Sequence, residues 1–418
     1  MDTSLRKKTN ILDLALCMVV VLACMVPRYI ATFKIKVGIN ISYYDIALLL
    51  LWVIVANKRY VKKQFEVLFF YIWLCIAFMS VWRSEAINLW AYYILYLSIT
   101  ILAIQFFNTI SSERVFDLAA RAFSFALLIH VLIGLYEVTH HRYLFEVGSF
   151  SKRYYGKTAV SIFHNPNDYS TFLIVLLPFS IYCMTHARRF GEKIINAGII
   201  IASVVLLILG ESRLAIIALF LMGGMIYIAL VRKSRYRFLC DAFLIFMAAV
   251  IILTPSVRSW IGRVLRNNTL NLNSNSDIIR VNLIKNGLAF LKQTYGFGVG
   301  AGNLYDWFKF RSVYNIGNIL YMHNWYIEIL ATFGILLFVL YMIFHIRILI
   351  DLFRQAAKEK NILGIHVAYL SSFLCFSIMS ISSSTNVYSE WVWMYLALLC
   401  SYCVFYRKRG ELTEVTSS

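Results

Sequence analysis

A histidine stands at the mouth of a long apolar stretch, directly after a long polar segment. Residues 321–344 read YMHNWYIEILATFGILLFVLYMIF, with His323 and Asn324 at the start and Glu328 within the first turns. A neutral imidazole can take a proton from a hydroxyl group, and the positive end of a helix dipole favours that neutral form. A helix that begins at Asn324 would make His323 its N-cap and a candidate general base, with Asn324 beside it as a candidate substrate contact. The alternative is an interfacial histidine without a chemical role.

An arginine interrupts a second apolar stretch. Residues 194–231 are largely apolar except at 210–213, which read GESR, so a tight turn between two helices fits this segment. An arginine costs about 2.5–3.5 kcal/mol at the middle of a membrane helix, so Arg213 needs a compensating partner near the hydrocarbon. That partner is either Glu211, in a structural ion pair, or an anionic ligand such as a pyrophosphate. Glu211 is itself a candidate ligand contact.

Polar side chains also gather at the entrance of a third apolar stretch. The segment FHNPNDYS at 163–170 contains Asn165, Asn167 and Asp168 around a proline. Proline is favoured in the first turn of a helix, and Asn167 or Asp168 could cap it. Capping explains much of this pattern, but the number of hydrogen-bonding groups also suits the hydroxyl groups of a sugar. We therefore include these three residues among the candidate substrate contacts.

The long polar segment 255–323 carries more cations than topology requires. Helical spacing predicts an amphipathic helix at 255–266, lying on the membrane surface, and a second helix at 277–293. Arg280 and Lys285 lie on the second helix and could bind phosphate oxygens. The alternative for both is an ordinary solvated charge.

Alternating glycines follow this second predicted helix. Residues 296–302 read GFGVGAG and break the helix. Without a Cβ atom, Gly298 and Gly300 let the backbone pass close to a ligand or to another segment of chain. The spacing fits neither a dinucleotide-binding fingerprint nor a P-loop.

The elements that must position these residues are membrane helices. Hydrophobic residues make up 61% of the 418 residues and charged residues only 15%, whereas a soluble domain is near half apolar. Apolar runs of membrane-spanning length recur along the chain. We predict an all-α, polytopic membrane protein with about twelve spans, near 11–30, 41–56, 66–82, 87–107, 116–138, 167–185, 194–210, 214–231, 239–254, 324–346, 362–381 and 389–406.

Lysine and arginine predict the orientation. They cluster in short segments that fall on one side when both termini are cytoplasmic. Two outer segments, the loop 139–166 and the large loop 255–323, are nevertheless cationic, which suits a lipid-linked phosphate or, alternatively, anionic headgroups. The predicted organisation is spans 1–9 in 1–254, the large outer loop in 255–323, and spans 10–12 with a cytoplasmic tail in 324–418.

Several function classes are disfavoured by the composition. The net charge of +19 would suit nucleic acid, but the charges are spread over short loops rather than gathered on one soluble face, so we predict no nucleic-acid partner. No metal-binding spacing of histidine, cysteine or acidic residues occurs on the outer side. The cysteines lie in or beside apolar runs and are interpreted as packing residues.

The ordered motifs resemble the O-antigen ligase and polymerase superfamily. The resemblance covers about 160–345 and rests on HNPNDYSTFLIVLLP, GESR, DIIRVNLIKNGLAFL with GFGVGAG, and MHNWYIEILATFGILL. It implies an integral membrane glycosyltransferase that uses an undecaprenyl-diphosphate-linked glycan at the outer face of the bacterial cytoplasmic membrane, without metal, cofactor or nucleotide sugar. Carried over to this chain, the family's histidine matches His323, and its two arginines match Arg213 and Arg280.

From these residues we predict an inverting polymerase of surface polysaccharide repeat units. Its partners would be an undecaprenyl-diphosphate-linked oligosaccharide donor, a lipid-linked glycan acceptor and membrane lipids, with a chain-length regulator protein as a further candidate. An O-antigen ligase that transfers the glycan to lipid A core is the close alternative. A transporter or flippase of the same lipid is the alternative from another class, but it would need polar groups near mid-membrane.

Overall fold

The computed structural model shows a protein built of helices. It describes residues 11–25, 32–34, 40–55, 64–145, 158–210, 212–231, 238, 241, 275–359, 363–383 and 385–417. Each expected span in this part of the chain coincides with a helix, and the span expected at 239–254 lies outside it. These helices are α1 (Ile11–Met25), α2 (Tyr43–Val55), α3 (Phe65–Met79), α4 (Ile87–Ile110), α5 (Glu113–His140), α6 (Pro166–His186), α7 (Phe190–Leu209), α8 (Arg213–Val231), α13 (Trp325–Lys358), α14 (Ile365–Met379) and α15 (Glu390–Ser417).

Length and composition suit a multi-pass membrane protein. Of the helices in the described residues, 6 are long and apolar enough to cross a membrane: α4, α5, α6, α7, α13 and α3 together with the 3-10 turn η1 (Ser80–Arg83) that continues it. The apolar helices α1, α2, α8 and α14 are shorter. The expected total of about twelve spans therefore stays a prediction.

Two helices extend beyond the expected spans. α13 continues to Lys358 rather than ending at 346, and α15 continues beyond 406 to Ser417. Hydropathy marks only the apolar part of a helix, whereas the extension of α13 is amphipathic and buries Ile348, Asp351 and Leu352 at helical spacing. The all-α expectation also omitted two short antiparallel strands, β1 (Thr32–Lys34) and β2 (Asn40–Ser42).

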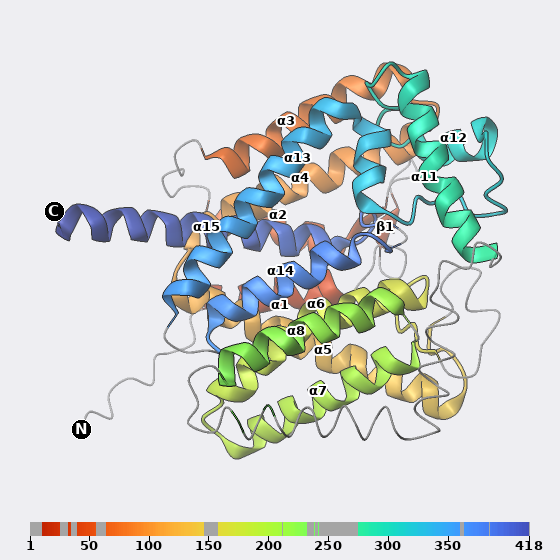
Figure 1. Cartoon of the computed structure of the whole chain (residues 1–418). Coiled ribbons are helices and arrows are strands. Elements are labelled where there is room, and N and C mark those ends of the chain that lie inside the picture. The colour runs from red at the N-terminus through yellow and green to blue at the C-terminus, as the bar shows by residue number, and fades with distance from the viewer. Residues whose placement is uncertain are drawn as a thin grey trace, which may run out of the picture.

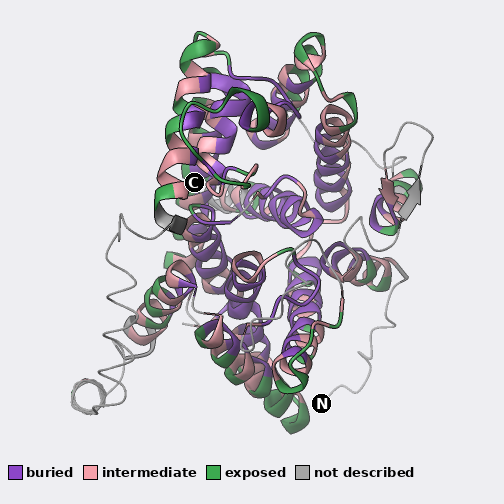
Figure 2. Cartoon of the chain, turned by 90° about the vertical axis from the view of Figure 1, so that its right-hand side faces the viewer, coloured by how far each residue is buried: buried purple, intermediate pink, exposed green. Residues whose placement is uncertain are grey.

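α6 forms the centre of one half of the bundle. It packs against α5, α7 and α14, and all its side chains from Tyr169 to Ser180 are buried. In the other half, α15 packs against α4 and α1. The helices run roughly alongside one another in Figure 1, and in Figure 2 the buried residues lie mainly on the inner helices and the exposed residues mainly at the periphery. Exposed apolar side chains at that periphery are expected where lipid is the solvent.

The segment that follows the gap after 241 packs as a small unit at one end of the bundle (Figure 1). It contains α11 (Asn275–Gln293), which confirms the helix expected at 277–293, and the short α12 (Leu304–Arg311), which the sequence analysis missed. The helix expected at 255–266 lies outside the described residues. A separate apolar core holds this unit together: Leu283, Phe290, Val299, Leu304, Trp307, Phe308, Ile316, Met322 and Ala331. α11 also packs against α13.

Candidate active site

The candidate site is carried by a helix that is broken near its start. Gly334 within α13 has φ 82° and ψ −178°, so the turns before it form a separate short helical segment. Residues 296–302, which we call the glycine loop, form backbone hydrogen bonds on both sides of this break. These bonds are 2.8–2.9 Å long: Val299 N to Ala331 O, Gly300 N to Thr332 O, and Ile335 N to Gly296 O. Backbone groups freed by a break in a membrane helix need such partners.

The glycines at 296–302 are explained by this close approach to α13. A Cβ atom on Gly298 would lie 2.5 Å from the backbone nitrogen of Gly334, and Gly298 has φ +77°. A Cβ atom on Gly300 would lie 3.1 Å from Ser80 Cβ. Of the two expectations for these glycines, the structure therefore shows passage near another segment of chain. Ligand contact by Gly298 and Gly300 stays a prediction.

The start of α13 differs by one residue from the expected one. The N-cap is Asn324, whose side chain accepts a hydrogen bond from Ile327 N at 3.1 Å, so His323 is not the cap but precedes it. Asn324 Oδ1 thus serves the helix, as asparagine commonly does at this position. His323 itself has φ 51°, an uncommon conformation for a non-glycine residue. Strained residues of this kind cluster at functional sites.

The environment of His323 favours a neutral imidazole. Burial, and then the positive charge of Arg280, lower the pKa of His323 to about 4, while a backbone hydrogen bond with Ser382 opposes them. Within the described residues, His323 Nδ1 is buried and has no hydrogen-bond partner. The lowered pKa favours an uncharged imidazole at neutral pH, and its Nδ1 makes no hydrogen bond with the described part of the chain.

α11 brings Arg280 to His323. Gly287 of α11 lies against the start of α13, because a Cβ atom there would come within 2.5 Å of Met322 Cε and 3.1 Å of Ile327 Cγ2. Arg280 lies two turns earlier and acts electrostatically on His323. Lys285 is exposed, with its ammonium 5.4 Å from the centre of the Tyr314 ring.

Asn165 caps α6, rather than Asn167 or Asp168 as expected. Its Oδ1 accepts hydrogen bonds from the backbone nitrogens of Asn167 and Asp168 at 2.9 and 3.0 Å, and Pro166 occupies the first turn. Its amide also donates to Asp168 Oδ2 at 2.7 Å. The capping interpretation of this motif is therefore confirmed for Asn165, whereas sugar binding by these three residues stays a prediction.

Arg213 is the first residue of α8, and Gly210, three residues earlier, is the C-cap of α7. The turn before it packs on α6, because a Cβ atom on Gly210 would lie 3.2 Å from Ser170 Oγ. Figure 1 places the α7–α8 turn and the starts of α6 and α13 at the end of the bundle that carries α11 and α12. The convergence of Arg213 with His323 on one ligand stays a prediction, and Glu211 lies outside the described residues.

The sequence analysis missed the contribution of residues 380–390. This segment reads SISSSTNVYSE, and its polar composition between two apolar helices was the available signal. Ser380 O accepts a hydrogen bond of 2.8 Å from Trp325 N at the start of α13. Thr385 Oγ1 donates to Oε1 of the buried Glu328 at 2.7 Å. The charge of Asp168 also acts on Glu328, so the starts of α6 and α13 and this segment share one site.

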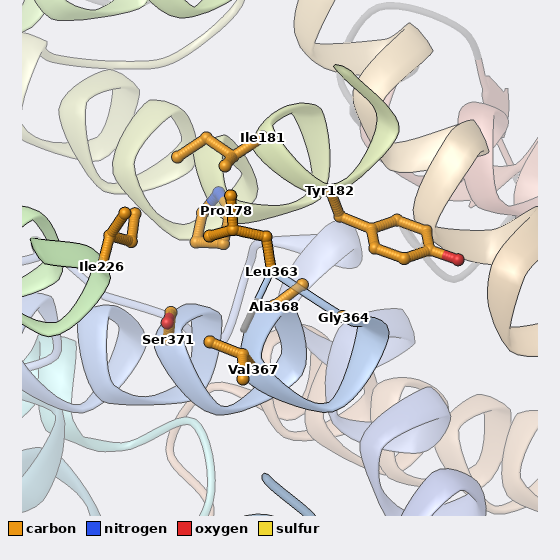
Figure 3. A pocket seen from close by; sticks show the side chains of 9 residues that line it. All are labelled: Pro178, Ile181, Tyr182, Ile226, Leu363, Gly364, Val367, Ala368 and Ser371. Carbon is orange, nitrogen blue, oxygen red and sulfur yellow. The ribbon is translucent and has the colours of Figure 1, made fainter. Parts of the chain in front are cut away.

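A cavity elsewhere in the bundle lacks the polar side chains of the candidate site. It is a small cavity of about 10 Å³ between α6, α8 and α14, and its lining is mainly apolar (Figure 3). Pro178 in its wall lies ten residues after Asp168, about 15 Å along α6. With no charged side chain in its lining, this cavity offers neither a base nor a group that binds phosphate. Among the described residues, no three histidine, cysteine or acidic side chains gather as metal ligands.

Comparison with known proteins agrees with the motifs. Residues 198–342 match a family model described as O-antigen ligase. The teichuronic acid biosynthesis protein TuaE of Bacillus subtilis (strain 168) is 28% identical over 279 residues, which cover 64% of this chain and 57% of TuaE. The match thus spans just over half of that relative's length. The matched region includes Arg213, Arg280 and His323, and these findings confirm the resemblance of the chain to the O-antigen ligase and polymerase superfamily.

Proposed function

We propose that this protein is a membrane glycosyltransferase that joins carrier-linked oligosaccharide repeat units into a surface polysaccharide. The O-antigen ligase family match and the similarity to a teichuronic acid biosynthesis protein support a role in polysaccharide biosynthesis. The observation that carries the proposal is the neutral imidazole of His323 in the electrostatic field of Arg280. A base for a hydroxyl group and a cation for a phosphate are the two groups that such a transfer needs.

The reaction can be written as a single displacement. The acceptor hydroxyl oxygen forms a bond to the anomeric carbon of the donor sugar, and the bond from that carbon to the diphosphate oxygen breaks. His323 takes the hydroxyl proton, and the diphosphate leaves with the electron pair of the broken bond. One displacement inverts the anomeric configuration. The donor would be an undecaprenyl-diphosphate-linked oligosaccharide and the acceptor a lipid-linked glycan.

The arginines would stabilise the leaving group. A guanidinium binds two phosphate oxygens in a planar fork and keeps its charge at any physiological pH. Arg280 acts on His323 already, and Arg213 lies at the same end of the bundle. An imidazole with a pKa of about 4 is a weak base. A diphosphate bound at Arg280 would offset the positive charge and raise the pKa of His323, so substrate binding itself would prepare the base.

The charge distribution supports a site on the outer face. Arg347 and Arg354, in the second half of α13, lie far along the helix from His323, and the cationic tail 407–409 ends α15. Cytoplasmic segments of membrane proteins are enriched in lysine and arginine. We therefore place the termini in the cytoplasm, and His323 with the 255–323 loop on the periplasmic or extracellular side.

Transfer by purified protein tests this function. The assay supplies a synthetic undecaprenyl-diphosphate-linked repeat unit alone, without a lipid A core acceptor. A polymerase forms oligomers of increasing length, and His323→Ala forms none while eluting as folded protein. Transfer only after addition of a lipid A core would establish the ligase instead. Movement of the lipid across vesicles without any new glycosidic bond would favour the flippase and contradict the proposal.

A further inference from the structure

Buried polar atoms without hydrogen-bond partners gather where the segment 380–390 meets the start of α13. Among the described residues, they include Nδ1 of His323, Oε2 of Glu328 and Oγ of Ser383. Buried polar groups are nearly always paired, and an unpaired one costs about 1–3 kcal/mol. This grouping beside the candidate base indicates a ligand that supplies several hydrogen-bonding groups of its own.

Glu328 is the most informative member of this group. Glu328 is only 5% exposed, and its Oε1 accepts a hydrogen bond from Thr385 Oγ1 at 2.7 Å. Thr385 Oγ1 also accepts a hydrogen bond from Val387 N at 3.3 Å, so the backbone of the segment holds this hydroxyl in place. Among the described residues, Oε2 of Glu328 has no hydrogen-bond partner. This oxygen can form a hydrogen bond with a sugar hydroxyl, which donates to an ionised carboxyl group and accepts from a protonated one.

The surroundings of Glu328 favour a sugar over a phosphate. The charge of Glu328 acts on Tyr93, Tyr321 and Tyr388, and the charge of Asp168 acts on Glu328. Neither Glu328 nor Asp168 offers a positive charge that would bind an anionic diphosphate. Sugar hydroxyls, in contrast, donate to carboxylates, and aromatic rings provide the flat apolar surfaces on which sugar rings pack.

We propose that Glu328 and Thr385 form the subsite for the sugar that carries the attacking hydroxyl. This inference rests on the proposed glycosyl transfer and specifies where its acceptor binds. Oε2 of Glu328 accepts a hydrogen bond from a hydroxyl on the acceptor sugar, while His323 faces the hydroxyl that reacts. Both residues belong to the start of α13: His323 precedes the N-cap Asn324, and Glu328 lies in the first turns.

Kinetics with two non-interchangeable substrates test this subsite. The donor is the carrier-linked repeat unit with its attacking hydroxyl methylated, and the acceptor is the same repeat unit as an alkyl glycoside, which lacks a diphosphate. In the full-length protein in nanodiscs, Glu328→Gln is expected to raise the acceptor KM about 10-fold to 100-fold, the usual effect of leaving a buried polar group without its hydrogen bond. Thr385→Val should raise it less, and both variants should leave the donor KM unchanged.

A second buried carboxylate provides a matched control. Glu137 lies near the end of α5, and its carboxylate is fully buried. In contrast to Glu328, it accepts backbone hydrogen bonds from Leu144, Val160 and Ser161 at 2.8–3.2 Å. Glu137→Gln should therefore lower the unfolding temperature without changing the acceptor KM. An unchanged acceptor KM in both Glu328→Gln and Thr385→Val would overturn the subsite, as would a fall in kcat alone.

Direct binding separates the subsite from the proposed function. The alkyl glycoside of the repeat unit, with no donor present, is titrated into wild-type protein and Glu328→Gln in a calorimeter. Binding to wild type that is lost in the variant supports the subsite even if no transfer occurs, in which case the glycosyltransferase proposal alone fails. Equal binding to both proteins, or no binding to wild type, refutes the subsite and leaves the transfer assay to judge the function.

Discussion

Each end of the bundle buries a glutamate, but the two glutamates have different partners. At one end, Glu66 of α3 pairs with Arg407 at 2.7 Å and Arg347 at 3.1 Å, and Arg407 also pairs with Asp351. At the other end, the hydroxyl of Thr385 is the one hydrogen-bond partner of the Glu328 carboxyl group among the described residues. The two sites are well separated, since Glu328 and Arg347 lie about 28 Å apart along α13 if its kink is ignored.

This difference distinguishes a structural cluster from a site prepared for a ligand. Around Glu66, two carboxylates face two guanidinium groups, so the protein compensates the charges itself, although Oε2 of Glu66 makes no hydrogen bond. Around Glu328, compensation comes from a neutral hydroxyl, and the nearby imidazole is neutral as well. Groups that a fold holds in place without compensating them are the ones available to a substrate.

Removal of the base should have the largest effect on activity. His323→Asn is expected to reduce transfer about 10²–10⁴-fold, the contribution of a general base, because the amide cannot accept the proton. Asparagine tolerates the positive φ at this position, so the fold should persist. Transfer is measured as glycan length on gels together with the unfolding temperature. Normal chain lengths from a folded variant would remove His323 from the mechanism.

Neutralisation of Glu66 should affect stability instead. Glu66→Gln removes the carboxylate that pairs with both Arg347 and Arg407, while Arg407 keeps Asp351. We expect the free energy of unfolding to fall by about 2–3 kcal/mol, less than for a fully buried pair because both arginines are partly exposed. Transfer per folded molecule should not change. The unfolding temperatures of Glu66→Gln and Glu328→Gln are measured under the same conditions, and Glu66→Gln should unfold at the lower temperature. A lower unfolding temperature for Glu328→Gln would contradict the assignment of Glu66 to a structural cluster.

A substitution at the break in α13 should have a smaller, local effect on stability. Gly298→Ala forces a Cβ atom against the backbone of Gly334 at a positive φ, so we expect a loss of about 1–3 kcal/mol and looser attachment of the segment that carries Glu328. Gly191→Ala is the control, because no heavy atom lies within 4 Å of its Cβ position. Hydrogen exchange of 325–335 reports the loosening. Equal exchange in both variants would show that the glycine loop does not hold α13.

Arg280 should influence how kcat/KM depends on pH. Its charge lowers the pKa of His323, so the neutral base is present above about pH 4 and is lost as the pH falls through that value. In Arg280→Gln, burial still lowers the pKa but the repulsion is gone, so the acid limb of kcat/KM should move to higher pH. Because kcat/KM reports the free enzyme, this shift is separate from weaker substrate binding. An unmoved acid limb would place Arg280 too far from His323 to act on it.

The sequence predicted the positions of the helices well, but it predicted the tertiary contacts between them poorly. Apolar runs located the helices because hydropathy is a local property, and the polar entrance at His323 was visible for the same reason. The hydrogen bonds from the glycine loop to the break at Gly334, and the contact of Thr385 with Glu328, join segments far apart in the chain. No periodicity encodes such pairs. Asn324 and Asn165 could have been recognised as N-caps, because asparagine is favoured there.

The central claim is that His323 and Arg280 share one anionic ligand. The most direct measurement is a ¹⁵N NMR titration of the imidazole of His323, assigned with His323→Asn, in the presence and absence of inorganic pyrophosphate. The account predicts a pKa of about 4 without ligand, a rise when pyrophosphate binds, and a much smaller rise in Arg280→Gln. A pKa near the ordinary histidine value of about 6.5 that pyrophosphate leaves unchanged would contradict it.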